Sequence, residues 1–335
     1  MPGLQTSRSR PLHLADEKHY PTIASMNNKN LTIQQNRRLS ESGAIGAIDM
    51  GSKSFKFVLG RKQEGQVLTE LIKKERLGIG KEVTENHGII GEKKCEEIDN
   101  ALVWFKQYCQ ERGAETVIAV ATSAIRNARN RQRIIDLAHR SNIEIEIADG
   151  VREGVIGYFA ATGGAPNRVV SDSGSRSIQI AWESQGTIHS RSTPVGYEHV
   201  YEIFVEHADS MMETEEGFNR FLDGNFSELP TTAVELISLA ANTLTTFVTG
   251  MERTDRENRY LQRSSLERKL IELRELTETE YIHLKSSLDD AEKILPGLVF
   301  LTYLMRRTNM QRALVAEAEL PVGLIVEHFL KTESA

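Results

Sequence analysis

The chain has 335 residues, enough for two ordinary domains, and its 39% hydrophobic and 26% charged residues are typical of a globular protein in water. A formal net charge of -6 argues against a global basic field that would attract nucleic acid or an anionic membrane, so an anionic ligand has to be held by a local cluster. No apolar run approaches the roughly 18 residues that span a bilayer, and we expect a cytoplasmic protein with neither nucleic-acid nor membrane partners.

The first segment, residues 1–42, is polar and punctuated by Pro, Ser and Asn. It contains no apolar signal core, and its composition predicts a disordered N-terminal tail. The only cysteines, Cys95 and Cys109, lack metal-ligand spacing. We interpret them as free thiols in a reducing compartment.

Residues 43–165 predict a first α/β lobe. It opens with a hairpin over residues 44–60, because Phe55 and Phe57 alternate with polar residues after a short turn. A strand, helix, strand, helix, strand and helix are then predicted at 69–80, 91–113, 115–124, 130–142, 143–150 and 152–164. This order indicates a sheet with mixed strand directions.

Residues 166–335 predict a second α/β lobe with helical additions, which again opens with a hairpin. Helical patterns follow at 231–251, 277–295 and 297–309. Thr277 and Glu280 form a capping-box pattern at the start of the second of these. Residues 312–330 predict a strand, a turn at Pro321 and Gly323, and a last helix.

The two hairpins carry the same turn chemistry. "AIDMGSKSFKFVLG" (47–60) and "VVSDSGSRSIQIAW" (169–182) share the pattern D-x-G-S-[KR]-S followed by apolar alternation, 123 residues apart. A duplicated α/β unit gives two lobes that face each other across a central cleft, and each lobe then presents one turn to that cleft. The repeat therefore predicts a paired site.

Such turns suit phosphate. Gly and Ser let several backbone N–H groups point at one anion, the hydroxyls add donors, and the basic residue adds charge. The candidate phosphate-binding residues are Gly51, Ser52, Lys53, Ser54, Gly174, Ser175, Arg176 and Ser177. Asp49 and Asp172 repel phosphate themselves, so they indicate a hard cation such as Mg²⁺ that bridges them to phosphate oxygens.

Several of these motifs resemble those of the exopolyphosphatase and guanosine pentaphosphate phosphohydrolase (Ppx/GppA) family. The first turn is similar to that family's D-x-G-S-N-S motif. Further similar segments are "ERLGIG" (75–80), "AVATSAIRNARN" (119–130), "ADGVREG" (148–154), "ILPG" (294–297) and "ELPVGLI" (319–325). The resemblance implies a two-lobed, duplicated actin-like (ribonuclease H-like) fold, in a short member without the C-terminal helical domain of longer relatives.

The resemblance also implies an activity. Family members hydrolyse phosphoanhydride bonds, usually with Mg²⁺, and a Glu in the segment that matches 148–154 is the general base. Glu153 stands at that position and Arg126 at that of an Arg facing substrate phosphate. A carboxylate that takes a proton from attacking water and a guanidinium that pairs with phosphate oxygens fit those roles.

The chain departs from the family pattern in the second turn. Ser175 and Arg176 replace two glycines, and Gln179 replaces an acidic residue that would bind a hard cation better. Two outcomes stay open. One is a phosphatase acting on polyphosphate, guanosine pentaphosphate or a related phosphorylated metabolite. The other is a catalytically impaired protein that binds a phosphorylated ligand and acts as a regulatory or interaction protein. The sequence also leaves open whether the chain forms a homodimer.

Overall fold

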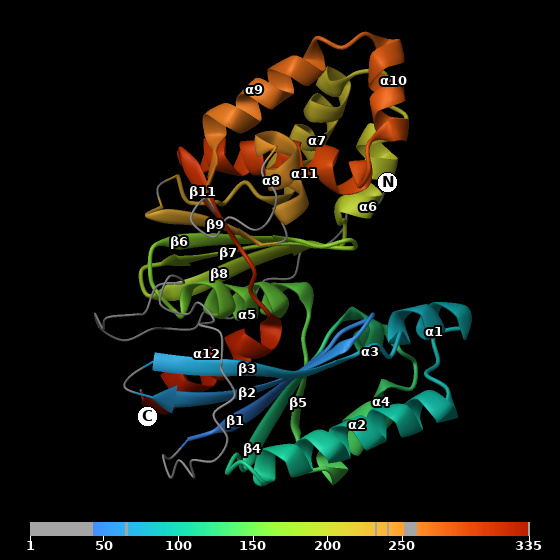
Figure 1. Ribbon diagram of the computed structural model, residues 1–335, viewed down its shortest axis with the longest axis vertical. Coiled ribbons are helices and arrows are strands. Elements are labelled where there is room, and N and C mark those ends of the chain that lie inside the picture. Colours follow the sequence, from blue (N-terminus) through green and yellow to red (C-terminus); the bar gives the residue numbers. More distant parts are fainter. Residues whose placement is uncertain (1–42, 64–65, 232, 240, 251–259, 334–335) are drawn as a thin grey trace. The chain divides into compact units, whose positions relative to one another are not determined.

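The computed structural model describes residues 43–63, 66–231, 233–239, 241–250 and 260–333, and the chain divides into two compact units (Figure 1). The N-terminal unit contains the described residues up to Ala165 together with those from Ala318 onward, and the C-terminal unit contains Pro166–Glu317. The tail predicted at 1–42 lies outside the described residues.

The N-terminal unit is built on a five-stranded sheet in the order β3-β2-β1-β4-β5. Its strands are β1 (Ile45–Met50), β2 (Phe55–Gln63), β3 (Gln66–Glu75), β4 (Thr116–Ala121) and β5 (Glu144–Ile147). The first three pair antiparallel, whereas β4 and β5 extend the sheet from β1 in parallel. The predicted mixed sheet is confirmed.

Strand β1 is buried along its whole length because it lies at the centre of this sheet. Ile48 and Met50 pack with helix α2 (Glu92–Gln110), and Ile45 and Ala47 pack on the opposite face. The remaining helices in the chain segment up to Ala165 are α1 (Ile79–Glu85), α3 (Ser123–Asn127), α4 (Arg131–Arg140) and α5 (Gly150–Thr162).

The last helix, α12 (Leu320–Glu333), belongs to the N-terminal unit. Its Ile325 and Phe329 pack against Ile45 and Ala47 on the face of the sheet opposite α2. The sequence prediction that residues 318–335 belong to the second lobe is therefore wrong. The sheet leaves one apolar face of β1 to be covered, and this helix covers it.

Pro321 and Gly323 lie inside α12 and do not form the predicted turn. Proline is accepted in the first turn of a helix because its missing N–H has no intrahelical partner there. The glycine has a packing reason. A Cβ at Gly323 would lie 2.0 Å from the carbonyl oxygen of Ile156 on α5, so only glycine allows this approach of the two helices.

The C-terminal unit repeats the sheet of the first, in the order β10-β11-β9-β6-β7-β8. Its strands are β6 (Arg168–Ser173), β7 (Ile178–Ser184), β8 (Thr187–Thr193), β9 (Glu235–Leu239), β10 (Tyr260–Gln262) and β11 (Arg312–Ala316). Strands β6, β7 and β8 pair antiparallel, and β9 and β11 follow β6 in parallel. The predicted duplication is confirmed, with β10 added at the edge.

Helices gather on one side of this second sheet (Figure 1) and form one large core with it. They are α6 (Tyr197–Val200), a π-helix η1 (Tyr201–Val205), α7 (Met211–Asn225), α8 (Asn242–Thr249), α9 (Arg263–Arg274), α10 (Glu278–Ser287) and α11 (Ala291–Arg307). The predicted capping box of Thr277 and Glu280 is present at the start of α10.

Two predicted helices are wrong in part. Residues 231–251 contain strand β9 before α8, because a short buried strand and a helix segment give the same run of apolar residues. Residues 277–295 contain two helices, since α10 ends at Ser287 and Asp290 adopts a left-handed conformation with φ 58° before α11.

Both cysteines are free and buried, as predicted. Burial raises the pKa of the Cys109 thiol to about 12, which leaves it protonated and unreactive at neutral pH. Within the described ranges, no helix has the length and apolar character that crossing a bilayer requires.

Candidate active site

The first turn, Gly51–Ser54, is held by backbone bonds from the segment that follows β3. The N–H of Gly78 donates to the carbonyl of Lys53 at 3.1 Å, and the N–H of Gly80 donates to that of Ser52 at 2.8 Å. A Cβ at Gly80 would lie 2.9 Å from the Cβ of Ser52. The glycines of "ERLGIG" therefore support the turn from behind.

The side chains of the turn differ in their surroundings. The hydroxyls of Ser52 and Ser123 lie 3.1 Å apart, which ties the turn to the start of α3. Lys53 is the exposed member of the turn. The carbonyls are thus engaged by the protein, while the one cationic side chain faces solvent.

Asp49 lies one residue before the end of β1 and is 8% exposed. Its Oδ1 is buried and has no hydrogen-bond partner among the described residues. The pKa of this carboxyl is raised to about 7, mainly by burial; the positive charge of Lys56 opposes the rise, and the nearby carboxylates of Glu153 and Glu319 add to it. A buried acceptor without a donor is the kind of group that a cation satisfies.

Arg126 and Glu153 form an ion pair in the same unit, with Arg126 Nη1 2.9 Å from Glu153 Oε1. The same nitrogen donates to the carbonyl of Ala148, at the end of β5. Glu153 lies in the first turn of α5, whose N-terminus is capped by Asp149 accepting from the N–H of Arg152 at 2.8 Å. The guanidinium thus holds the carboxylate at the beginning of a rigid helix.

These residues meet because of sheet topology. Asp49 is the penultimate residue of β1, Arg126 follows β4 on α3, and Glu153 follows β5 on α5. The three strands are parallel neighbours, so their carboxyl ends share one edge of the sheet, the usual position of ligand sites in α/β folds.

The second turn, Gly174–Ser177, has the same construction in the C-terminal unit. The N–H of Tyr197 donates to the carbonyl of Gly174 at 3.0 Å, and the N–H of Glu198 to that of Ser175 at 3.3 Å. Gly196 packs directly on the turn, since a Cβ there would lie 2.3 Å from the backbone nitrogen of Arg176. Arg176 is the exposed member, as Lys53 is in the first turn.

Asp172 and its neighbours repeat the register of the first hairpin. Asp49 pairs across the strands with Lys56, and Asp172 pairs with Gln179. The amide of Gln179 donates to the hydroxyl of Ser177 at 2.7 Å, so the residue that replaces an acid here stabilises the turn. Asp49 and Asp172 belong to different units, and the cleft predicted between them stays a prediction.

Sequence reasoning missed two residues of the Asp49 environment. Lys56 and Glu319 form an ion pair of 3.1 Å, and both act on the pKa of Asp49. The position of Lys56 opposite Asp49 could have been found from the sequence by counting the hairpin pairs outward from the turn. Glu319 opens the segment "ELPVGLI", which resembles a family motif, but nothing in that segment indicated that it approaches Asp49, since this depends on the packing of α12.

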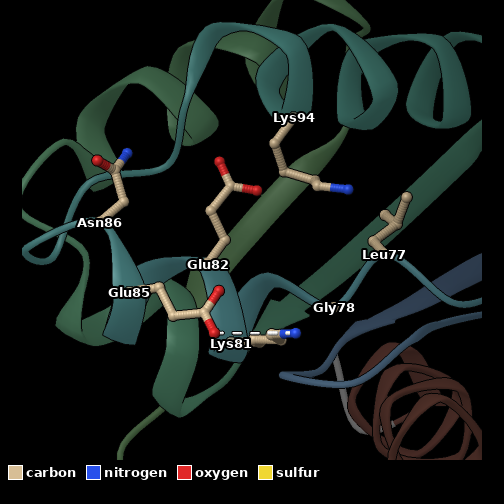
Figure 2. Close-up of a pocket in the computed structure, with 7 residues that line it drawn as sticks. All are labelled: Leu77, Gly78, Lys81, Glu82, Glu85, Asn86 and Lys94. Carbon is tan, nitrogen blue, oxygen red and sulfur yellow. Dashed lines mark ion pairs between the residues drawn. The ribbon is translucent and has the colours of Figure 1, made fainter.

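A pocket of about 450 Å³ lies beside the first turn and contains none of the predicted site residues (Figure 2). It is lined by Leu77, Gly78, Lys81, Glu82, Glu85, Asn86 and Lys94. Two of its acidic side chains have partners: Lys81 lies 3.8 Å from Glu85, and Glu82 accepts from the N–H of Gly91 at 2.7 Å. One lining residue, Gly78, donates to the carbonyl of Lys53, and we interpret these residues as a structural support of the first turn.

Comparison with known families decides the identity of the chain. The model of the Ppx/GppA phosphatase family matches residues 58–332. The chain belongs to this family. The match includes Arg126, Glu153 and the second turn, while Asp49 and the first turn precede it.

Solved structures of Ppx/GppA proteins share the fold. The Aquifex aeolicus family member is 22% identical, with a TM-score of 0.71 over 87% of this chain and 99% of that one. An exopolyphosphatase from Cytophaga hutchinsonii is 20% identical, with a TM-score of 0.59 over 87% of this chain and 98% of that one. The duplicated sheets place this Ppx/GppA protein in the actin-like fold class.

Proposed function

We propose that this chain is a phosphatase that hydrolyses a phosphoanhydride or phosphate ester, with polyphosphate, guanosine pentaphosphate or a related phosphorylated metabolite as substrate. The observation that carries the proposal is the arrangement in the N-terminal unit. A carboxylate fixed by a guanidinium, Glu153 with Arg126, lies close enough to the buried Asp49 to raise its pKa.

In the proposed reaction Glu153 is the general base. It takes a proton from a water molecule as the water oxygen bonds to phosphorus and the bond from phosphorus to the leaving oxygen breaks. Arg126 uses only Nη1 in its bonds to described residues, which leaves Nε and Nη2 to donate to phosphate oxygens. The N–H groups and hydroxyls of the turn at Gly51–Ser54, with Lys53, hold and neutralise phosphate.

The residues present fit a magnesium ion that is completed by substrate and water. In the described part of the chain, no group of three or more His, Cys, Asp or Glu side chains is arranged to hold a metal ion by itself. Mg²⁺ characteristically takes one or two protein carboxylates and completes its octahedron with water and phosphate oxygens. Asp49, with its unpartnered Oδ1, and Asp172 are the proposed ligands, and the ion would neutralise charge on the transferred phosphoryl group.

The second turn favours a second candidate, an impaired family member that binds a phosphorylated ligand without turnover. Ser175 and Arg176 add side chains where the resembled motif has glycines, and Gln179 is committed to Ser177. The turn therefore keeps donors and charge for an anion but offers no second carboxylate beside Asp172.

One experiment separates the two candidates. Wild type and Glu153→Gln are incubated with polyphosphate, guanosine pentaphosphate and simple phosphate esters, with Mg²⁺ or with chelator. Phosphate release and the melting temperature are measured on the same samples. We expect Mg²⁺-dependent release that falls by about 10²- to 10⁴-fold in the variant while its circular dichroism is unchanged. Ligand-induced stabilisation without release identifies the binding protein, and equal release by both proteins refutes the role of Glu153.

A further inference from the structure

Two consecutive residues of α5, Arg152 and Glu153, form ion pairs with two different helices. Successive residues of an α-helix are separated by about 100° around its axis, so their side chains leave in different directions. Glu153 meets Arg126 on α3, whereas Arg152 meets Glu327 on α12. Any rotation of the first turn of α5 therefore moves both contacts together.

The contact between Arg152 and Glu327 is a two-point fork in a buried place. Arg152 Nη1 and Nη2 donate to the two carboxylate oxygens of Glu327 at 2.9 and 2.6 Å, and Nε donates to Glu146 on β5 at 2.8 Å. Glu327 is 3% exposed and also pairs with Lys331 at 2.9 Å. Two parallel bonds to a planar guanidinium fix orientation as well as distance.

The charges around Arg152 favour its ionised form. Burial by itself lowers the pKa of Arg152, yet the bonds to Glu146 and Glu327 raise that pKa above its usual value. Two acidic side chains from β5 and α12 thus hold one cation on α5. Removing the cation leaves Glu327 buried, and among the described residues only the ammonium of Lys331 still pairs with it.

Helix α12 presses on α5 at a second point. Gly323 approaches the carbonyl of Ile156 so closely that a Cβ would lie 2.0 Å from the oxygen. Gly323 and Glu327 are four residues apart and lie on the same face of α12. Backbone contact at one turn and the fork at the next together set how α5 is rotated against α12.

We propose that Arg152 is a positioning residue that aligns the first turn of α5 through Glu327 and thereby places the carboxylate of Glu153 against Arg126. This inference rests on the proposed function of Glu153. A side chain lies about 6 Å from its helix axis, so a rotation of about 10° displaces it by about 1 Å. A displacement of that size at a reacting group lowers a rate by up to about 10²-fold.

The test compares Arg152→Met and Glu327→Gln with a matched control, Arg274→Met. Arg274 donates two bonds to Glu215, which is also buried, but both residues belong to the C-terminal unit, whereas α5 belongs to the N-terminal unit. We expect kcat for phosphate release to fall by about 10- to 100-fold in the first two variants with KM changed less than about twofold. We expect the control to lose thermal stability while it keeps its kcat.

Combined and conservative variants sharpen the result. Arg152→Met together with Glu327→Gln should cost no more in kcat than Arg152→Met alone, because the two residues act through one contact. Arg152→Lys, which keeps the charge and loses the fork, should recover part of the rate and supplies a folded protein if the methionine variant does not fold. Wild-type kcat in the Arg152 variants, or an equal fall in the Arg274 control, overturns the positioning role and leaves the proposed function standing.

A crystal structure of Arg152→Met, or of Arg152→Lys if only that variant folds, gives a readout that does not depend on activity. Arg126 Nη1 and Glu153 Oε1 lie 2.9 Å apart in the wild type, and we expect this hydrogen bond to be lost in the variant. If wild type releases no phosphate from any substrate, the proposed function fails, and the structure still decides the positioning role. An unchanged pair and an unrotated α5 overturn it.

Discussion

The substitution Asp49→Asn should stabilise this protein at alkaline pH while it removes the response to Mg²⁺. The carboxyl is buried and its Oδ1 has no hydrogen-bond partner among the described residues. Burial, opposed by Lys56, raises the pKa from 3.8 to about 7. The folded protein therefore keeps a proton at this site over a pH range in which the unfolded chain has lost it.

The sign of the effect follows from proton binding. Between pH 4 and 7 the unfolded state binds fewer protons at this residue than the folded state, so the free energy of unfolding decreases as pH rises. A pKa difference of about 3 corresponds to on the order of 4 kcal/mol at pH 8, as an upper estimate, of which about 3 kcal/mol is lost between pH 5 and pH 8. The amide of asparagine does not ionise, so the variant escapes this loss.

The assay is thermal melting of wild type and Asp49→Asn at pH 5 and pH 8, with and without Mg²⁺. With about 2 to 4 °C per kcal/mol for a domain of this size, the variant should gain several degrees over wild type at pH 8 and much less at pH 5. Mg²⁺ should raise the melting temperature of wild type only. The control is Asp136→Asn, at an exposed residue; it should change neither the pH dependence of the melting temperature nor its response to Mg²⁺. The same pH slope in Asp49→Asn and wild type would refute the reasoning.

Two glycine substitutions test the packing that supports the site. Gly323→Ala should destabilise the protein by about 3 kcal/mol in thermal or urea unfolding, because its methyl group meets the carbonyl of Ile156. Gly224→Ala has open space around the added methyl group and should stabilise the protein by up to about 1 kcal/mol. A gain in stability at both positions contradicts the close contact of α5 and α12. Gly196→Ala should abolish the polyphosphate-induced melting shift, because the methyl group displaces the backbone at Arg176, and a shift of wild-type size would show that the second turn takes no part in binding.

The sequence was most informative where a local pattern determines local structure. The alternation after each D-x-G-S turn specified the two hairpins, and the repeat of that turn anticipated two sheets with the same strand pairing. The capping box of Thr277 and Glu280 likewise formed as predicted, because both partners lie within one helical turn.

The sequence was misleading where burial decides between alternatives. The pattern of residues 235–239, with Leu236, Ile237 and Leu239 apolar, suits a helix or a central strand. Their pairing between β6 and β11 makes them strand β9. Pro321 and Gly323 looked like a turn, but one occupies the first turn of α12 and the other its contact with α5.

The sequence by itself determined the two duplicated hairpins with their D-x-G-S turns, because these depend on residues close together in the chain. Only the tertiary structure decided that α12 returns to the N-terminal unit, bringing Glu319 toward Asp49 and Glu327 to Arg152. Burial and charge at Asp49 arise from groups that are distant in sequence, and the closure of the sheet and its covering helices brings them into contact.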